Sequence, residues 1–260
     1  MMIDLNCDMG ESFGAYALGA DEALMPLVTS ANIACGYHAG DPMVMDRTVR
    51  LALRYGVGIG AHPGFPDLMG FGRRAMHLRT EEIENYVLYQ VGALEAFARS
   101  VGAELIHVKP HGALYNMAAR DPAIAQAVAR GVARAGPHRI LVGLAGSALI
   151  QAAAEVGLSA AREGFADRAY LPDGALAPRH LPGAVIKDPE QAADQAVSIA
   201  LRREVRTVDG QVIPLVADTL CIHGDTPGAV EIACAVRRRL EDVGVEVIPM
   251  GKFLPSARRD

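Results

Sequence analysis

Residues 104–115 read ELIHVKPHGALY, and this stretch indicates both the fold and the position of a functional site. Its first part, residues 104–107, is a short apolar run typical of a buried strand, and Pro110 and Gly112 then interrupt regular structure. A cation, Lys109, and an imidazole, His111, therefore follow directly after the end of a predicted strand. We expect a catalytic loop at this position.

Four other predicted strands carry polar side chains at their ends in the same way. Apolar strand bodies with Asp, His or Lys at their exits are typical of a parallel sheet or barrel whose C-terminal edge is an active site. The pattern therefore indicates an enzyme. The four strands read IDLNCD (3–8), ANIACGYH (31–38), VGIGAH (57–62) and LCIHGD (220–225).

The order of predicted helices and strands favours a barrel. Four helices are predicted to begin with an N-cap side chain followed by proline, and five glycines are predicted to end helices in the left-handed conformation. Short β-type runs follow most of these glycines, which gives six or seven β-α units with parallel strands. Polar residues follow the ends of five or more strands, whereas an open doubly wound sheet usually has its site at one switch point. We therefore predict an irregular (β/α) TIM-like barrel of the α/β class, with seven parallel strands, rather than an open sheet. The N-cap pairs are Asp41-Pro42, Asp121-Pro122, Asp188-Pro189 and Thr226-Pro227, and the glycines are Gly56, Gly102, Gly136, Gly157 and Gly244.

The length and composition of the chain fit one globular barrel. At 260 residues, we expect a single domain spanning residues 1–260. The net charge of −5 lacks the basic excess of nucleic-acid-binding proteins. No apolar segment reaches the roughly 18–20 residues that cross a bilayer. We therefore expect neither a nucleic-acid partner nor a membrane role.

The cysteines point to a reducing compartment. The four cysteines form no C-x-x-C pair, and the chain begins with a predicted strand rather than a signal peptide. We expect reduced, mostly buried thiols in a cytoplasmic protein. These residues are Cys7, Cys35, Cys221 and Cys234.

Two long connections, residues 64–79 and 167–187, lack helical periodicity. Long loops without structure of their own are commonly lids or binding loops, and a contact between subunits is the alternative. The first loop contains Arg73, and the second contains Arg168 and Arg179.

Candidate functional side chains follow the first three predicted strands. Asn6 and Asp8 share one face of the first strand, and Glu11 follows a glycine that permits a sharp turn. For Asp8 and Glu11 the alternative is capping of a helix. His38 and His62 hold equivalent positions on the next two strands, where together with Asp8 they fit either an Asp/His/His metal site or an acid–base cluster. Since residues on separate strands have no diagnostic spacing, we assign no metal.

Further candidates lie later in the chain. Lys109 and His111 point to one side if the backbone is extended, where a cation stabilises negative charge and an imidazole transfers protons. His107 lies deeper in the strand and is expected to be a core histidine. Glu163 is a general-base candidate, with pairing to a neighbouring arginine as the alternative. Asp225 is a substrate-binding candidate, with assistance to a helix cap as the alternative.

The six motifs that carry these residues resemble those of the LamB/YcsF family of lactam-utilisation proteins, which supplies the A subunit of the bacterial ATP-dependent 5-oxoprolinase. By contrast, the chain has no G-x-x-x-x-G-K-[ST], strand-linked G-x-G-x-x-G or G-x-S-x-G motif for nucleotide binding or serine catalysis. The motifs span nearly the whole chain: DLNCDMGE (4–11), NIACGYHAGD (32–41), GAHPG (60–64), VKPHGALYN (108–116), EGFADR (163–168) and HGD (223–225).

The resemblance implies an irregular (β/α) barrel related to sugar deacetylases. It also implies cleavage of 5-oxo-L-proline to L-glutamate, coupled to hydrolysis of ATP to ADP and phosphate, together with two partner proteins, subunits B and C. ATP with Mg²⁺ is expected to act through these partners, which agrees with the lack of a nucleotide motif in this chain.

On this hypothesis, the chain binds oxoproline and directs water. Lys109 or Arg73 holds the substrate carboxylate, while an acid or imidazole activates water and protonates the leaving nitrogen. The predicted catalytic residues are Asp8, His38, His62, Lys109 and His111, and the predicted substrate-binding residues are Asn6, Glu11, Arg73, Glu163 and Asp225.

Two alternatives remain at this stage. One is a free-standing, metal-dependent amide or acetyl hydrolase, suggested by Asp8, His38 and His62. The other is a non-catalytic subunit that presents oxoproline to its partners.

Overall fold

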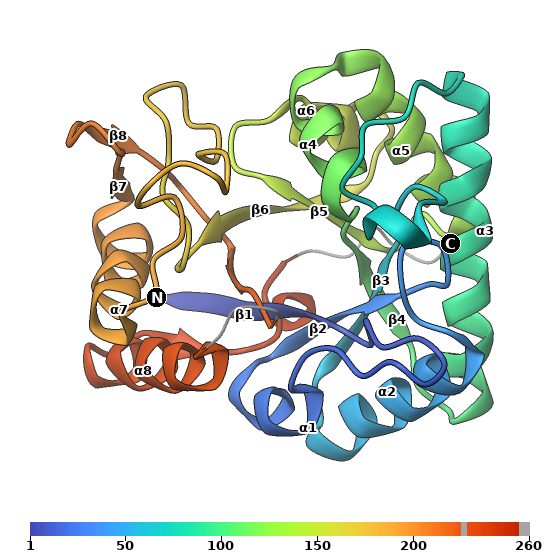
Figure 1. Ribbon diagram of the computed structural model, residues 1–260, viewed down its shortest axis with the longest axis horizontal. Coiled ribbons are helices and arrows are strands. Elements are labelled where there is room, and N and C mark those ends of the chain that lie inside the picture. The colour runs from blue at the N-terminus through green and yellow to red at the C-terminus, as the bar shows by residue number, and fades with distance from the viewer. Residues whose placement is uncertain (225–227, 255–260) are drawn as a thin grey trace.

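Seven parallel strands close into a barrel in the computed structural model, which describes residues 1–224 and 228–254, and helices surround the strands (Figure 1). The last strand of the ring pairs with the first, with Asp4 opposite Thr219, so the sheet has no open edge there. The predicted seven-stranded irregular barrel is therefore confirmed. In ring order the strands are β1 (Met2–Met9), β2 (Ser30–Ala34), β3 (Gly58–His62), β4 (Leu105–Val108), β5 (Ile140–Leu144), β6 (Ser159–Phe165) and β9 (Thr219–Ile222).

Three short strands lie outside this ring. The predicted strand at 245–248 is β10 (Glu246–Val247), which pairs with the first residues of β1, Met2 and Ile3, and is not part of the barrel ring. Strands β7 (Glu204–Arg206) and β8 (Val212–Pro214) form an antiparallel hairpin that the sequence did not predict.

The helices begin largely where the Asp-Pro pairs predicted. The carboxylates of Asp41, Asp121 and Asp188 accept hydrogen bonds from backbone N–H groups of the first helical turn. The Thr226-Pro227 pair lies outside the described residues. The helices are α1 (Asp21–Leu24), α2 (Pro42–Tyr55), α3 (Thr80–Ser100), α4 (Gly112–Arg120), α5 (Pro122–Ala135), α6 (Ala148–Glu155), α7 (Pro189–Val197) and α8 (Ala229–Asp242), with short turns η1 (Met25–Leu27), η2 (Leu68–Gly70), η3 (Ser198–Arg202) and η4 (Met250–Lys252).

One of the predicted helix ends differs from the expectation. Gly56 ends α2 in the left-handed conformation, with φ 67°, as predicted. Gly136 ends α5 with φ 164° and ψ 116°, which is extended backbone, so the left-handed cap predicted there is wrong. The guanidinium of Arg139 occupies the space next to Gly136, where an added Cβ would lie 1.8 Å from Nη1. Gly136 is therefore needed for close packing rather than for a left-handed turn.

The predicted catalytic loop after β4 is short, because α4 begins at Gly112. Gly112 has φ +54°, and a Cβ at this position would lie 2.6 Å from the carbonyl oxygen of Gly72. The Ala113 N–H donates to that same carbonyl at 2.9 Å. The start of α4 therefore holds the 64–79 loop against the C-terminal end of the barrel.

The interior of the barrel contains a group of hydrogen-bonded polar side chains, which we call the interior network: Asp4, Asn6, Asn32, His107 and Thr219. All five are completely buried. The hydrogen bond between Asn32 of β2 and His107 of β4 joins strands that are not neighbours in the ring, so these side chains point inward. The other hydrogen bonds of the network join neighbouring strands. Around the barrel, apolar residues of the strands and helices form one large hydrophobic cluster. Within the part of the chain that is described, no helix combines the length and the apolar character needed to cross a membrane.

Candidate active site

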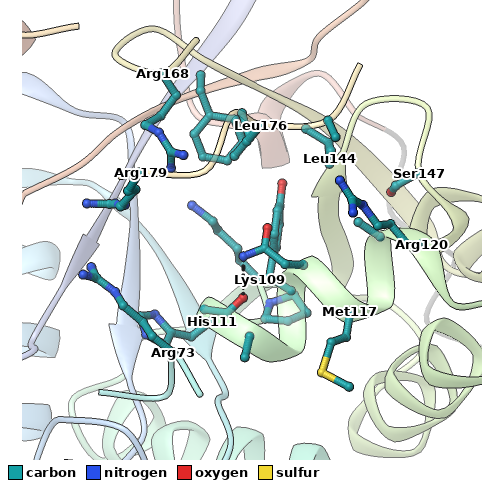
Figure 2. A pocket seen from close by; sticks show the side chains of 18 of the residues that line it. Arg73, Lys109, His111, Met117, Arg120, Leu144, Ser147, Arg168, Leu176 and Arg179 are labelled. Atoms are coloured by element: carbon teal, nitrogen blue, oxygen red, sulfur yellow. Dashed lines mark hydrogen bonds between the residues drawn. The ribbon is translucent and has the colours of Figure 1, made fainter. Parts of the chain in front are cut away.

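A cavity of about 780 Å³ opens at the C-terminal ends of the barrel strands. This is the end at which the sequence predicted polar side chains. Asp8, His62 and Lys109 lie at its floor, and the two long loops, 64–79 and 167–187, contribute to its walls. Figure 2 shows Arg73, Arg168 and Arg179 on one side of the cavity and Arg120 of α4 on the other. A concave site at this end of a (β/α) barrel is the usual position of an active site.

Lys109 is the centre of a buried charge cluster at the cavity floor. Its Nζ lies 2.7 Å from Oε1 of Glu163, 3.1 Å from Oδ1 of Asp8 and 3.1 Å from Oδ1 of Asn6. Burial alone would lower the pKa of Lys109, but the carboxylates of Asp8 and Glu163 outweigh it and hold this pKa well above its ordinary value. The ammonium group is therefore charged, and its three N–H donors already have acceptors within the protein.

The two carboxylates next to Lys109 differ in their surroundings. Glu163 is completely buried, and its Oε2 accepts a hydrogen bond from the Tyr115 hydroxyl at 2.6 Å. Asp8 keeps 14% of its side chain exposed and lines the cavity. Burial would raise the pKa of Asp8, but His62 and Lys109 hold it well below its ordinary value. Asp8 is thus an ionised carboxylate that a ligand in the cavity can contact.

Three histidines and one glutamate form a second group beside this cluster, which we call the histidine cluster: Glu11, His38, His62 and His111. The ring of His38 stacks on that of His111, with centroids 3.7 Å apart and planes 4° apart. Nε2 of His62 lies 3.0 Å from Nδ1 of His111, and Oε1 of Glu11 lies 3.9 Å from a ring nitrogen of both His38 and His111. One ligand atom from each of the four side chains lies within 4.8 Å of all the others. These are the described residues that could hold a metal ion.

Two imidazoles of this cluster, those of His38 and His111, are kept neutral by their surroundings. Burial, with neighbouring imidazoles, lowers the pKa of His38 well below its ordinary value and that of His111 to about 3. His38 is completely buried, and neither of its ring nitrogens has a hydrogen-bond partner among the described residues. A buried polar group without a partner costs about 1–3 kcal/mol, so such a group points to a ligand or a functional constraint.

A further acid–imidazole pair lies across the cavity. Nδ1 of His223 lies 2.9 Å from Oδ1 of Asp167, and the backbone N–H of His223 donates to Oδ2 at 3.0 Å. The His223 ring stacks on Phe165, with centroids 5.6 Å apart. This pair connects the end of β6 to the end of β9. The neighbouring candidate Asp225 lies outside the described residues.

The arginines of the cavity wall are not equally available. Arg168 donates to the carbonyl oxygens of Ala184 and Ala177, at 3.2 and 2.6 Å, and so holds its own loop together. The guanidinium of Arg73 lies over the ring of Phe71, 5.0 Å from its centroid, and the Arg73 side chain is exposed at the cavity. Arg73 is therefore better placed than Arg168 to meet an anionic group of a ligand.

The structure divides the residues that the sequence singled out. Asn6, His38 and Glu163 are completely buried, do not line the cavity and instead contact residues that do. The lining contains the others: Asp8, Glu11, His62, Arg73, Lys109 and His111. His107, expected to be a core histidine, lies in the interior network, with Nε2 2.8 Å from Oδ1 of Asn32.

Sequence reasoning missed three contacts at the site. Asn32 donates to Asp8 at 2.9 Å, Tyr115 binds Glu163, and the Cys221 sulfur lies 3.2 Å from Nζ of Lys109. For Asn32 a signal existed, because parity within the second strand places it on the same face as His38 if the strand is extended that far. For Tyr115 and Cys221 the sequence offers no signal beyond their places in polar motifs.

Comparison with known proteins gives a consistent result over nearly the full length of the chain. A family model described as the LamB/YcsF family matches residues 3–255. A protein of Pyrococcus furiosus, named as the A subunit of 5-oxoprolinase, is 55% identical over 254 residues, covering 98% of this chain and 100% of the relative. One of the same name from Heliobacterium modesticaldum is 57% identical over 247 residues, covering 95% and 97%.

Solved structures agree with this result. The crystal structure of a lactam utilization protein from Thermus thermophilus has a TM-score of 0.91 and 52% identity, covering 95% of this chain and 99% of that one. The structure described as T48 deacetylase with substrate has a TM-score of 0.50 at 15% identity, covering 99% and 94%. The second likeness shows the fold alone, a barrel shared with a deacetylase, as expected from the sequence.

Proposed function

The chain belongs to the LamB/YcsF family, and from this membership we propose that it is the A subunit of a 5-oxoprolinase in the cytoplasm. The reaction is cleavage of 5-oxo-L-proline to L-glutamate, coupled to hydrolysis of ATP to ADP and phosphate. In this proposal residues 1–260 act as one domain, and subunits B and C complete the enzyme and bring ATP with Mg²⁺ to the lactam. The relatives that carry the 5-oxoprolinase name, at about 55% identity over nearly the whole chain, support it.

One observation carries the chemical part of the proposal: the ionised Asp8 lies between Lys109 and His62 at the floor of the cavity. Oδ1 of Asp8 is 3.1 Å from Nζ of Lys109, and Oδ2 is 3.2 Å from Nε2 of His62. A fixed carboxylate facing a cavity is suited to orient a water molecule and to accept its proton. We therefore assign Asp8 to direct water onto the lactam carbon once the partners have activated the carbonyl.

The substrate carboxylate belongs with Arg73 rather than with Lys109. From the sequence, either cation is a candidate for this role. Because Nζ of Lys109 is already bonded to Glu163, Asp8 and Asn6, it has no donor left for a substrate. In the proposal Lys109 keeps Asp8 ionised and in place, while Glu11 and His111 line the same cavity.

The test measures oxoproline-dependent release of ADP and glutamate, first with the purified chain alone and then with subunits B and C added. Activity only in the mixture is the expected result. Asp8→Asn should lower turnover of the mixture by about 10²–10⁴-fold, the range for loss of a general acid or base. Asp46→Asn is the matched control, because Asp46 lies at the surface of α2 and pairs with Arg50 in the i,i+4 position. Equal turnover in the Asp8 and Asp46 variants would remove Asp8 from the mechanism.

A free-standing, metal-dependent amide hydrolase is the second candidate function. The histidine cluster is the observation that favours it, since three imidazoles and a carboxylate are a common ligand set for zinc. Hydrolysis of an amide by the chain alone, without ATP, would decide for this candidate.

A further inference from the structure

We propose that Glu11, His38, His62 and His111 bind one divalent transition-metal ion of the zinc type. From the sequence we assigned no metal, and the only ligand set considered was Asp8, His38 and His62. The structure brings Glu11 and His111 into the group and places Asp8 beside it. This inference does not depend on which amide the enzyme cleaves.

The hydrogen bonds of His62 and His111 leave one ring nitrogen of each facing the other. Nδ1 of His62 lies 2.7 Å from the carbonyl oxygen of Lys109, and Nε2 of His111 lies 2.8 Å from that of Phe71. A carbonyl oxygen only accepts, so both of these nitrogens carry a proton. The other two nitrogens, Nε2 of His62 and Nδ1 of His111, face each other 3.0 Å apart, and Nε2 of His62 also lies 3.2 Å from Oδ2 of Asp8.

Two facing lone pairs would repel, so two ring nitrogens at this distance need a cation between them, either a proton or a metal ion. For tetrahedral zinc with Zn–N distances of 2.0–2.1 Å, neighbouring ligand atoms are about 3.3 Å apart. The 3.0 Å between the two imidazoles and the 3.9 Å from Oε1 of Glu11 to both His38 and His111 are close to this spacing. An imidazole that binds zinc also typically donates its other N–H to a backbone carbonyl or carboxylate, as His62 and His111 do here.

His38 supplies the second, independent observation. It is completely buried, and neither ring nitrogen has a hydrogen-bond partner among the described residues, although Nε2 points toward Glu11. Gly64 and Gly72 pack closely against the other parts of this side chain, since a Cβ on Gly64 would lie 2.7 Å from Nδ1 and one on Gly72 would lie 2.8 Å from Cβ. The 64–79 loop therefore holds the imidazole rigidly in place, and a metal ion would satisfy its free nitrogen.

The surroundings also suit a metal ion in charge and access. Glu11 belongs to the cluster and the carboxylate of Asp8 lies 3.2 Å from His62, so two carboxylates are near the site. Glu11, His62 and His111 line the cavity, which gives an ion a route to the site. Three imidazoles with one carboxylate favour zinc and its neighbours over magnesium or calcium, which prefer oxygen ligands.

The experiment is a metal titration of the full chain after treatment with a chelator, using Zn²⁺ alone and Co²⁺ alone as probes. We expect one ion per chain, with visible absorption of the Co²⁺ form typical of four-coordinate nitrogen and oxygen ligands. Glu11→Gln and His38→Ala should weaken binding by more than the roughly 10- to 100-fold that loss of an outer hydrogen-bond partner causes. Circular dichroism of each variant checks that the barrel is folded. Glu11→Gln keeps the size of the side chain, so it still tests the proposal if His38→Ala does not fold.

The matched control is His77→Ala, because His77 is exposed and belongs to the same 64–79 loop but not to the cluster. It should bind both ions as the wild type does. If the wild type binds neither ion more tightly than the Glu11 and His38 variants do, a proton rather than a metal joins the two nitrogens, and the proposal is wrong. Binding lost equally in the His77 variant would also overturn it, since the ion would then be held elsewhere.

Discussion

His107 and His38 are both completely buried histidines in the same barrel, but their surroundings differ. His107 belongs to the interior network, where its Nε2 donates to Oδ1 of Asn32 at 2.8 Å and its ring fills the space over Gly60. His38 belongs to the histidine cluster and has no hydrogen-bond partner among the described residues. Burial alone therefore does not distinguish a structural from a functional histidine in this protein.

The difference extends to the two groups as a whole. In the interior network, Asp4 accepts hydrogen bonds from Thr29, Ser30 and Thr219 and from the backbone N–H of Met250. In the histidine cluster, both ring nitrogens of His38 lack a hydrogen-bond partner among the described residues, and two ring nitrogens of His62 and His111 face each other at 3.0 Å. A satisfied polar group stabilises the fold, whereas an unsatisfied one is tolerated where a ligand completes it. Substitutions in the interior network should therefore affect stability, and those in the histidine cluster should affect ligand binding.

Lys109 connects the two groups, and its substitution should have the largest effect. Lys109→Met removes the ammonium from between Asp8 and Glu163 and also removes one of the two donors to Oδ1 of Asn6, the other being Asn32. Breaking a buried ion pair on one side typically lowers stability by about 3–5 kcal/mol. Urea unfolding measures this loss. Glu163→Gln added to Lys109→Met should restore part of it, and a loss below about 1 kcal/mol in the single variant would contradict the assigned role of Lys109.

Asp4→Ala should have the next largest effect, and only on stability. The substitution leaves the hydroxyls of Ser30 and Thr219 without their acceptor, and that of Thr29 with only the Leu5 carbonyl. We expect this to lower the free energy of unfolding by about 2–4 kcal/mol. The zinc stoichiometry should stay that of the wild type. His38→Ala should show the reverse pattern, with a smaller loss of stability and loss of the ion. The same pattern in both variants would remove the distinction between the two groups.

Zinc should also stabilise the wild type by mass action. At a free Zn²⁺ concentration 100 times the dissociation constant, a ligand that binds only the folded state adds about 2.7 kcal/mol. Thermal unfolding with Zn²⁺ and with a chelator measures the difference. Glu11→Gln should show little of this stabilisation at the same concentration, whereas His77→Ala should show all of it.

The sequence predicted the fold well because the signals involved are local. Asp41 and Pro42 lie next to each other, and so do the last strand residue and the polar side chain that follows it. A cap or a strand end can therefore be inferred without knowing the rest of the fold. The β7–β8 hairpin was missed because its strands are only three residues long and lack a clear alternation.

The site was less predictable because its contacts join distant parts of the chain. Glu163 was expected to face the substrate, but it turns toward Lys109, and this depends on the register between β6 and its neighbours. His38 lies four residues beyond the end of β2, where the two-residue period of a strand no longer gives the direction of a side chain. The parity argument that grouped Asp8, His38 and His62 therefore could not show that Glu11 and His111 complete the group.

Substitution of Asp67 should have the smallest effect on stability. Asp67 belongs to neither of the two groups. It lies in the 64–79 loop that covers the histidine cluster, where it accepts hydrogen bonds from the backbone N–H of Gly70 and from Arg74, whose side chain is 67% exposed. The hydrogen bond from Arg74 lowers the pKa of Asp67 from 3.8 to about 2. A carboxyl whose pKa is depressed in the folded state adds stability above its ordinary pKa and loses that stability as the pH falls toward the depressed value.

The melting temperature of the wild type should therefore exceed that of Asp67→Asn at pH 6, and the difference should shrink as the pH falls from about 4 toward 2. Because solvent screens the exposed Arg74, the difference should be small even at pH 6. Arg74→Met should reproduce the pattern, since it removes the group that depresses the pKa. A difference that stays constant over this range would mean that Asp67 acts through its shape and backbone contacts. The loop over the histidine cluster would then be held by packing and backbone contacts rather than by charge.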